Sequence, residues 1–279
     1  MSKKIQYLLE YFVMRGIIFS LFPLSSEIKS TIIKNLLKLI KPRKDLIKKQ
    51  LKMVFSDKDE VWIDKVVLDF YSNLATLTTE FFLTNWDTIS LESKNRENLL
   101  KAFSFGKGVI LVSGHIGNWE LGMREIAKEF PVNAIVKSVK NPFVDNFINN
   151  TRKRGNVKII YLKNLYRKVF EAIKKNEMVC IMLDQNARKE GVKMSFLGHK
   201  ASVFTSPVKL TIKTGATILP VFSYRKNGKI IVEFCKPIIP KNYKNNQEDI
   251  LNLTKILNLK LEKRILQNPA QWFWIHKRW

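Results

Sequence analysis

The sequence predicts an α/β protein in which a mostly parallel (mixed) central sheet is flanked by helices. From residue 108 onward, short apolar runs alternate with amphipathic ones, the order typical of a sheet covered by helices. Helical patterns precede that point. The chain has 279 residues with 46% hydrophobic content, which is enough for a large core. No internal repeat or long linker divides it, so we expect residues 1–279 to form one domain.

The amino-terminal segment 1–24 is expected to be an apolar helix. Gln6, Glu10 and Arg15 interrupt its apolar stretch from Ile5 to Leu24. They argue against a membrane-spanning helix, and a small-residue cleavage site for a signal peptide is missing. A membrane-associating helix, lying in the interface as an anchor, is one interpretation. A helix packed on the protein's own core is the other.

Charge is the next strong feature of the chain. Lys and Arg number 49 against 24 Asp and Glu, a net charge of +25. Seven of the basic residues fall between Lys38 and Lys52, with Asp45 as the single acid. Each contributes about 1 kcal/mol of attraction near an anionic bilayer. Nucleic acid, an anionic membrane surface and acidic substrates all fit this surplus, as does a solvated helix face.

The remaining elements follow in order. Residues 60–84 are expected to form a long helix with one apolar stripe, on which Glu80 has no assigned role. Strands are expected at 109–113, 132–137, 157–162, 178–183, 217–224 and 229–235. Helices are expected at 119–130, 142–154, 164–175, 204–214 and 247–267. Cys180 and Cys235 fall in apolar runs, which indicates buried free thiols, no metal site and a reducing compartment.

The segment Gly108–Leu121 carries the candidate chemistry. A β-branched strand ends in small residues and presents His115, one of three histidines, followed five residues later by Glu120. Asn118 is the expected helix N-cap. A carboxylate in the first helical turn can orient an imidazole and leave its other nitrogen basic. A catalytic pair of His115 with Glu120 and an ordinary capped helix are both compatible with this pattern.

Two further polar segments lie near expected element ends. Asp184 and Gln185 follow the strand 178–183, and ligands collect at the carboxyl ends of parallel strands. Asp184 as a substrate contact and Asp184 as a loop-capping residue both remain open. Arg152 and Arg154 end a helix, where they can hold an anionic group or complement the helix dipole.

Four ordered motifs resemble the bacterial lipid A biosynthesis acyltransferases, the lauroyl and myristoyl transferase family within the His-x4-acid lysophospholipid acyltransferase superfamily. They are Gly114-His115-Ile116-Gly117-Asn118-Trp119-Glu120, Asp184-Gln185 with Gly191-Val192 and Phe196-Leu197-Gly198, the run Pro207–Val221, and the tail Pro269–Trp279. The resemblance spans nearly the whole chain. Departures include Lys137 where many members have arginine, and Ala270 where glutamate is usual.

The resemblance implies an acyltransferase that moves a fatty acyl chain from an acyl thioester to a hydroxyl of a lipid A precursor. His115 would be the general base and Glu120 its partner. Asn118, Arg152, Asp184 and Gln185 would bind substrate or form the oxyanion site. Ser113 lacks the context of a nucleophile elbow, so no acyl-enzyme is expected. No cofactor or metal is expected; acyl carrier protein (ACP) or coenzyme A would supply the acyl group as co-substrate.

The implied partners are acyl carrier protein, a glycolipid acceptor and an anionic membrane surface. The implied location is the cytoplasmic face of the bacterial inner membrane, held peripherally or by one anchor. An acyltransferase acting on a lysophospholipid or another glycolipid is the nearest alternative. A basic nucleic-acid-binding protein is the non-enzymatic one, but it is disfavoured because most aromatic residues lie on apolar stripes. A membrane-surface scaffold without catalytic activity is the third alternative.

Overall fold

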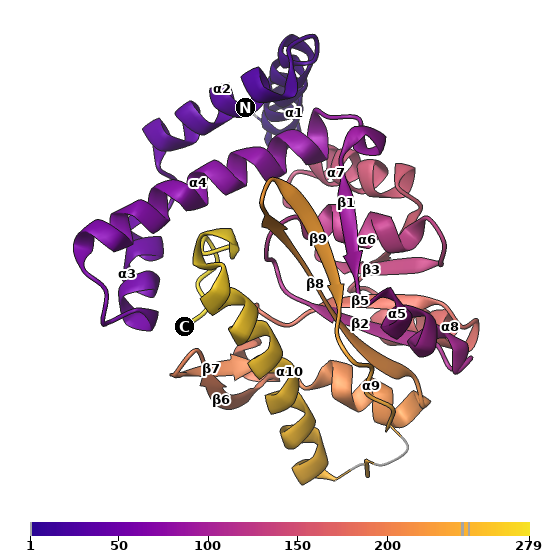
Figure 1. Ribbon diagram of the computed structural model, residues 1–279. Helices are drawn as coiled ribbons and strands as arrows, with labels where there is room; N and C mark the ends of the chain where they lie inside the picture. Colours follow the sequence, from indigo (N-terminus) through magenta and orange to yellow (C-terminus); the bar gives the residue numbers. More distant parts are fainter. Residues whose placement is uncertain (1, 241–242, 245) are drawn as a thin grey trace.

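A computed structural model describes residues 2–240, 243–244 and 246–279 of the chain (Figure 1). The helices before the sheet are α1 (Lys3–Leu21), α2 (Ser26–Ile40), α3 (Lys44–Val54) and α4 (Glu60–Phe82). The later helices are α5 (Arg96–Ser104), α6 (Trp119–Ala127), α7 (Pro142–Arg154), α8 (Leu165–Lys174), α9 (Ser206–Thr214) and α10 (Gln247–Gln267). Single 3₁₀ turns lie at Trp86–Thr88, Arg188–Glu190 and Pro269–Gln271.

Seven strands form the central sheet in the order β1-β9-β8-β2-β5-β3-β4. Their bounds are β1 (Leu91–Lys94), β2 (Val109–Ser113), β3 (Val132–Val136), β4 (Val157–Tyr161), β5 (Met178–Met182), β8 (Thr217–Lys226) and β9 (Lys229–Phe234). Only the β8–β9 pair is antiparallel among these neighbours. A separate antiparallel hairpin joins β6 (Val192–Phe196) to β7 (His199–Val203). The predicted α/β class and its mostly parallel, mixed sheet are therefore confirmed.

The central strand β2 shows why both faces of the sheet need helices. All five of its residues are buried. Ile110 and Val112 belong to one apolar core, and Val109 and Leu111 belong to a second, because successive side chains of a strand point to opposite faces. Helices α3, α4, α8, α9 and α10 contribute to the first core, and α5 and α6 to the second. The site described below lies where β2 ends.

The elements expected from sequence are found, with ends that differ by a few residues. The strand 178–183 is β5, which ends at Met182, and the helix 119–130 is α6, which ends at Ala127. β1, α5 and the β6–β7 hairpin were not predicted. Three of the four residues of β1 are exposed. The two strands of the hairpin have five residues each and mix polar with apolar residues. Neither segment therefore contains the apolar run that predicts a strand.

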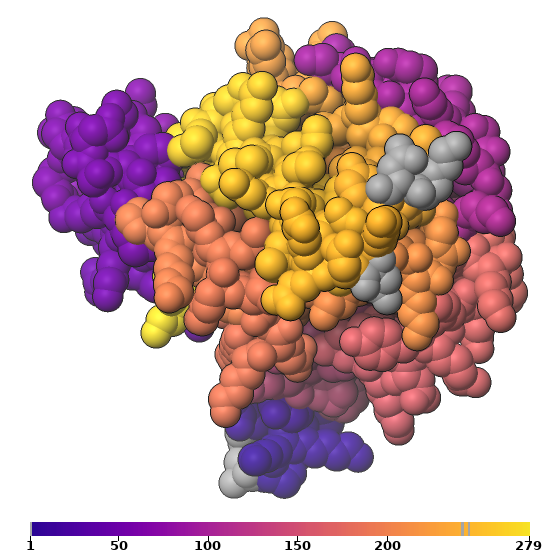
Figure 2. All heavy atoms as spheres, turned by 90° about the horizontal axis from the view of Figure 1, so that it is seen from below, coloured from indigo at the N-terminus to yellow at the C-terminus, as the bar shows by residue number. Residues whose placement is uncertain are grey.

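Helix α1 lies outside the two cores. None of the described residues of α1 is buried, and α1 rests on α7, where Tyr11 meets Phe143 at a ring-centroid distance of 6.0 Å. Figure 2 shows the indigo amino-terminal segment projecting from the body of the molecule. Helix α1 thus packs on the protein through α7 while most of its apolar side chains stay exposed, and its association with a membrane stays a prediction. In the described part of the chain, no helix combines the length and apolarity that a membrane crossing requires.

Candidate active site

The loop between β2 and α6 presents His115. Gly117 turns this loop with a φ of +57°, and a Cβ there would lie 2.2 Å from the backbone oxygen of Ser223, so only glycine fits. Asn118 caps α6 as predicted, because its Oδ1 accepts a hydrogen bond from the Leu121 amide at 3.0 Å. The His115 side chain is 17% exposed. The loop therefore holds the imidazole at the edge of the sheet, open to a substrate.

Asp184 is the carboxylate that contacts His115. The Nδ1 atom of His115 lies 2.8 Å from Asp184 Oδ1, and the His115 amide donates to Asp184 Oδ2 at 2.7 Å. Trp272 Nε1 donates to the same Oδ2 at 2.8 Å. Because a carboxylate accepts hydrogen bonds, Nδ1 carries the proton and Nε2 is the basic nitrogen. Nε2 has no hydrogen-bond partner among the described residues, so it is available for a substrate proton.

Each member of the His115–Asp184 pair shifts the pKa of the other. Burial opposes protonation of His115, but the Asp184 carboxylate outweighs it and raises the pKa of His115 above its ordinary 6.5. Burial likewise opposes ionisation of Asp184, but His115 and the hydrogen bonds to Oδ2 lower the pKa of that carboxyl well below its ordinary value. Asp184 thus stays ionised at neutral pH and favours the imidazolium that a base forms when it takes a proton.

The prediction that Glu120 contacts His115 is wrong. Glu120 pairs instead with Arg152 from the end of α7, whose Nε lies 3.0 Å from Oε2 and whose Nη2 lies 2.6 Å from Oε1. Both groups are largely buried, with side-chain exposures of 7% and 20%. Sequence spacing placed an acid near His115 but did not show its direction. Because β2 and β5 are neighbours with Ser113 opposite Met182, their following residues meet, and Asp184 takes that place.

Arg152 completes a polar cluster with α7. Its Nη1 donates to Asn149 Oδ1 at 2.9 Å. Burial alone lowers the pKa of an arginine, but the Glu120 carboxylate outweighs burial and raises the pKa of Arg152. Glu120 also favours the protonated form of His115 through space, while Arg152 opposes it. This ion pair therefore lies within electrostatic reach of the His115 ring, although it does not bond to it.

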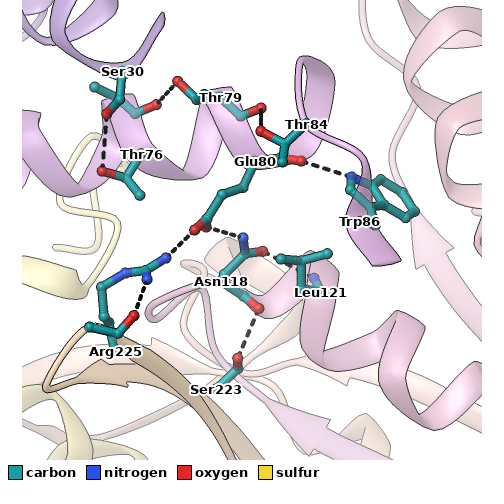
Figure 3. A network of polar contacts seen from close by, with 12 residues as sticks. Ser30, Thr76, Thr79, Glu80, Thr84, Trp86, Asn118, Leu121, Ser223 and Arg225 are labelled. Atoms are coloured by element: carbon teal, nitrogen blue, oxygen red, sulfur yellow. Dashed lines mark hydrogen bonds and ion pairs between the residues drawn. The ribbon is translucent and has the colours of Figure 1, made fainter. Parts of the chain in front are cut away.

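Asn118 makes hydrogen bonds within the turn and to Glu80 of α4 (Figure 3). Its Nδ2 donates to Glu80 Oε2 at 2.7 Å, its backbone oxygen accepts from Ser223 Oγ at 2.8 Å, and its side chain is buried. Arg225 from β8 pairs with the other oxygen of Glu80. The side-chain amide of Asn118 points toward Glu80 in this arrangement, and the oxyanion role of the loop N–H groups near Asn118 stays a prediction. Glu80, given no role from sequence, holds this turn.

The carboxy-terminal tail closes the other side of the loop. The Gly117 amide donates to the Gln271 oxygen at 2.9 Å, and the Phe273 amide donates to the His115 oxygen at 2.9 Å. Trp272, whose indole bonds Asp184, is 2% exposed. Sequence reasoning missed Trp272 and His276 as site residues. The available signal was a tryptophan-rich tail holding one of three histidines.

Gln185 lies in the site next to Asp184 and contacts the tail. Its Nε2 lies 3.3 Å from His276 Nε2. The His276 ring faces His115 with a centroid distance of 5.7 Å. Trp119 and Phe273 flank the His115 ring at centroid distances of 5.0 and 6.1 Å. Among the described residues, no group of three or more His, Cys, Asp or Glu side chains is placed to hold a metal ion.

An oriented histidine at the carboxyl end of a parallel strand is an arrangement suited to general acid–base chemistry on an α/β scaffold. The chain belongs to the bacterial lipid A biosynthesis acyltransferase family, whose model matches residues 2–279. The resemblance seen in the sequence is therefore confirmed.

Individual relatives are 22–24% identical to this chain over the aligned residues. A lipid A biosynthesis palmitoleoyltransferase of Escherichia coli K12 is 24% identical over 246 residues, 86% of this chain and 79% of the relative. A lauroyltransferase of the same organism is 22% identical over 254 residues, 87% and 80% of the two chains. A phosphatidylinositol mannoside acyltransferase of Mycolicibacterium smegmatis is 22% identical over 188 residues, 66% of this chain. The match spans 60% of that relative's length.

Proposed function

We propose that this protein transfers a fatty acyl chain from an acyl thioester to a hydroxyl of a lipid A precursor. The observation that carries the proposal is the His115–Asp184 pair, 2.8 Å apart, with Nε2 of the histidine free to take a substrate proton. The family match over residues 2–279 supports acyl transfer as the reaction class. Acyl carrier protein or coenzyme A serves as the acyl donor, and no cofactor takes part.

The reaction begins when Nε2 of His115 removes the acceptor hydroxyl proton. The hydroxyl oxygen forms a bond to the thioester carbonyl carbon, and the carbonyl electron pair moves to its oxygen. Asp184 stabilises the imidazolium, since it accepts from Nδ1 at 2.8 Å. The carbonyl then re-forms, the carbon–sulfur bond breaks, and the imidazolium returns its proton to the thiolate. A positioned base of this kind typically contributes about 10²–10⁴-fold in rate.

Glu120 and Arg152 act together beside this base. The carboxylate holds the guanidinium through two of its nitrogens, so the cation is fixed in a partly buried site. A fixed cation near His115 suits the negative charge of a donor or acceptor substrate. Gln185 lines the same region through its contact with His276. We therefore assign Glu120 to the positioning of Arg152 and not to the orientation of His115.

The amino-terminal surface fits a lipid-bound enzyme. Large apolar side chains of α1 and α2 are exposed: Ile5, Leu9, Phe12, Val13, Ile17, Phe19, Phe22, Ile28, Ile32, Leu36, Leu39 and Ile40. The basic segment Lys38–Lys52 follows at the end of α2 and along α3. An apolar helix and a basic segment are the two signals that peripheral attachment needs. We propose attachment to the cytoplasmic face of the bacterial inner membrane, with the excess positive charge binding anionic lipid and acidic carrier protein.

The test uses purified protein with acyl-ACP or acyl-CoA and a Kdo-lipid A precursor, with products identified by mass spectrometry. Wild type is compared with His115→Ala and with Glu92→Gln, an exposed carboxylate of β1 that pairs with Lys229. We expect acylation by wild type and the control, and none above background by His115→Ala. Undiminished acylation by His115→Ala contradicts the mechanism.

A phosphatidylinositol mannoside is the second candidate acceptor. The Mycolicibacterium smegmatis relative carries that name, and the same base serves any acceptor hydroxyl. Offering both acceptors in separate reactions decides between them, because each product has its own mass. Acylation of the mannoside alone overturns the lipid A assignment while leaving the chemistry intact.

A further inference from the structure

The proposed reaction places negative charge on the thioester carbonyl oxygen, and this charge needs a hydrogen-bond donor. Two of the donors nearest to His115 along the chain are engaged. The Gly117 amide bonds the Gln271 oxygen at 2.9 Å, and the Asn118 amide group points toward Glu80 (Figure 3). Each guanidinium nitrogen of Arg152 makes a hydrogen bond to Glu120 or Asn149, which fixes the orientation of the group. A further candidate donor lies on another element.

The tail segment that carries His276 lies beside His115. The tail is fixed there because Phe273 donates to the His115 oxygen and Arg43 Nη1 donates to the Ile275 oxygen at 3.0 Å. The His276 ring packs on Phe273 with a centroid distance of 5.0 Å and lies 5.7 Å from the His115 ring. It is partly exposed, so a substrate can reach it.

The tautomer of His276 follows from its contact with Gln185. An amide nitrogen can only donate, so Gln185 Nε2 donates to His276 Nε2 across 3.3 Å. A neutral imidazole that accepts at Nε2 carries its proton on Nδ1. Nδ1 has no hydrogen-bond partner within the described part of the chain. Burial and the neighbouring His115 lower the pKa of His276, and Arg43 adds to this while Asp184 opposes it, so the neutral form prevails at neutral pH.

We propose that His276 is a second catalytic residue, which donates a hydrogen bond from Nδ1 to the thioester carbonyl oxygen during acyl transfer. Its proton stays on the ring throughout, and the transferred proton still passes from the acceptor hydroxyl to His115 and then to the thiolate. The attacking oxygen and the carbonyl oxygen become bonded to one carbon, so base and donor must face one small volume. Two imidazoles 5.7 Å apart meet that condition.

The inference rests on the proposed function, and its test separates the two. We compare His276→Phe, which keeps an aromatic ring but has no donor, with His276→Asn, whose amide nitrogen stands close to the place of Nδ1. His115→Ala reports on the base. His199→Phe is the matched control, because His199 bonds the Met53 oxygen in another part of the molecule. Each variant is assayed for transfer and for hydrolysis of the acyl thioester without acceptor.

We expect His276→Phe to lower kcat about 10²–10³-fold for both transfer and hydrolysis, with KM and thermal midpoint unchanged. His276→Asn should recover most of this loss, and His199→Phe should resemble wild type. A kcat loss under about tenfold in His276→Phe overturns the inference. Equal losses in His276→Asn and His276→Phe also overturn it, because donor chemistry would then not be the cause. If His276→Phe lowers the rate of transfer but not of hydrolysis, the inference is also overturned, because His276 then acts on the acceptor and not on the thioester carbonyl. Activity in His115→Ala contradicts the proposed function, not this step alone.

Discussion

Replacement of Asp184 by asparagine distinguishes the observed pairing from the one expected along the sequence. The carboxylate accepts three hydrogen bonds: one from His115 Nδ1 at Oδ1, and two from the His115 amide and Trp272 Nε1 at Oδ2. An amide has one acceptor oxygen. Placing that oxygen at the Oδ2 position keeps two of the bonds, and turns the new NH₂ group toward Nδ1. His115 must then accept at Nδ1 and carry its proton on Nε2, which removes the base.

The expected loss in kcat for Asp184→Asn is about 10⁴-fold, the size associated with the wrong histidine tautomer. Stability should fall less, by about 1.5–3 kcal/mol, because the charged hydrogen bond to Nδ1 is replaced by a neutral one while the other two contacts are retained. Steady-state acyl transfer and denaturant unfolding measure the two quantities, with Glu92→Gln as the exposed-carboxylate control. A loss under about tenfold refutes the reasoning. A larger effect of Glu120→Gln than of Asp184→Asn on the pH dependence of the rate refutes it as well.

Three further predictions concern pH, the loop and the membrane. The value of kcat/KM should rise with pH through the pKa of His115, which lies above 6.5, because the base must be neutral. The raised pKa of His115 contributes stability that is present below pH 6.5 and is lost as the pH rises through the folded pKa. A pH–rate profile without that limb contradicts the assignment. Replacing Glu80 by Gln should lower the unfolding free energy by about 1–3 kcal/mol, measured in urea, because Arg225 loses its charged partner; an unchanged midpoint contradicts the role of Glu80 in holding the turn. Replacing Phe12 and Phe19, which are 63% and 81% exposed, by Ser should weaken binding to anionic vesicles by about 1.5–3 kcal/mol for each side chain. Wild-type vesicle binding by the double variant would rule out this surface as the attachment site.

The sequence predicted the parts of the fold that depend on strong local patterns. β2 is a fully buried apolar run, and α6 begins at an asparagine cap, so both could be identified from composition and spacing. β1 was not predicted because its four residues are mostly exposed. It is held by parallel pairing with β9, which lies more than a hundred residues away in the sequence. Pairing at that separation leaves no periodic signal in a short segment.

In the site, too, the sequence predicted local features but not contacts between distant segments. The sequence identified His115 through its glycine-rich setting, and Asp184 through its place after a strand. It did not show that these two side chains meet, because that depends on β2 and β5 being neighbours in the sheet. Glu120 was expected to contact His115 because it is only five residues away. Proximity along the chain was misleading here, since α6 turns Glu120 toward Arg152.

The contacts also separate the chemistry of the site from the charge of the chain. Each carboxylate around the His115 loop has its own cationic or imidazole partner: Asp184 with His115, Glu120 with Arg152, and Glu80 with Arg225. Largely buried charges are tolerated because they are paired in this way. The net charge of +25 therefore arises outside these pairs, where Lys and Arg outnumber the acids. A surplus located there bears on which surfaces and partners the protein binds, whereas the proposed proton transfer at His115 depends on the paired groups inside. Mutations of exposed lysines should accordingly change KM and its salt dependence before they change kcat.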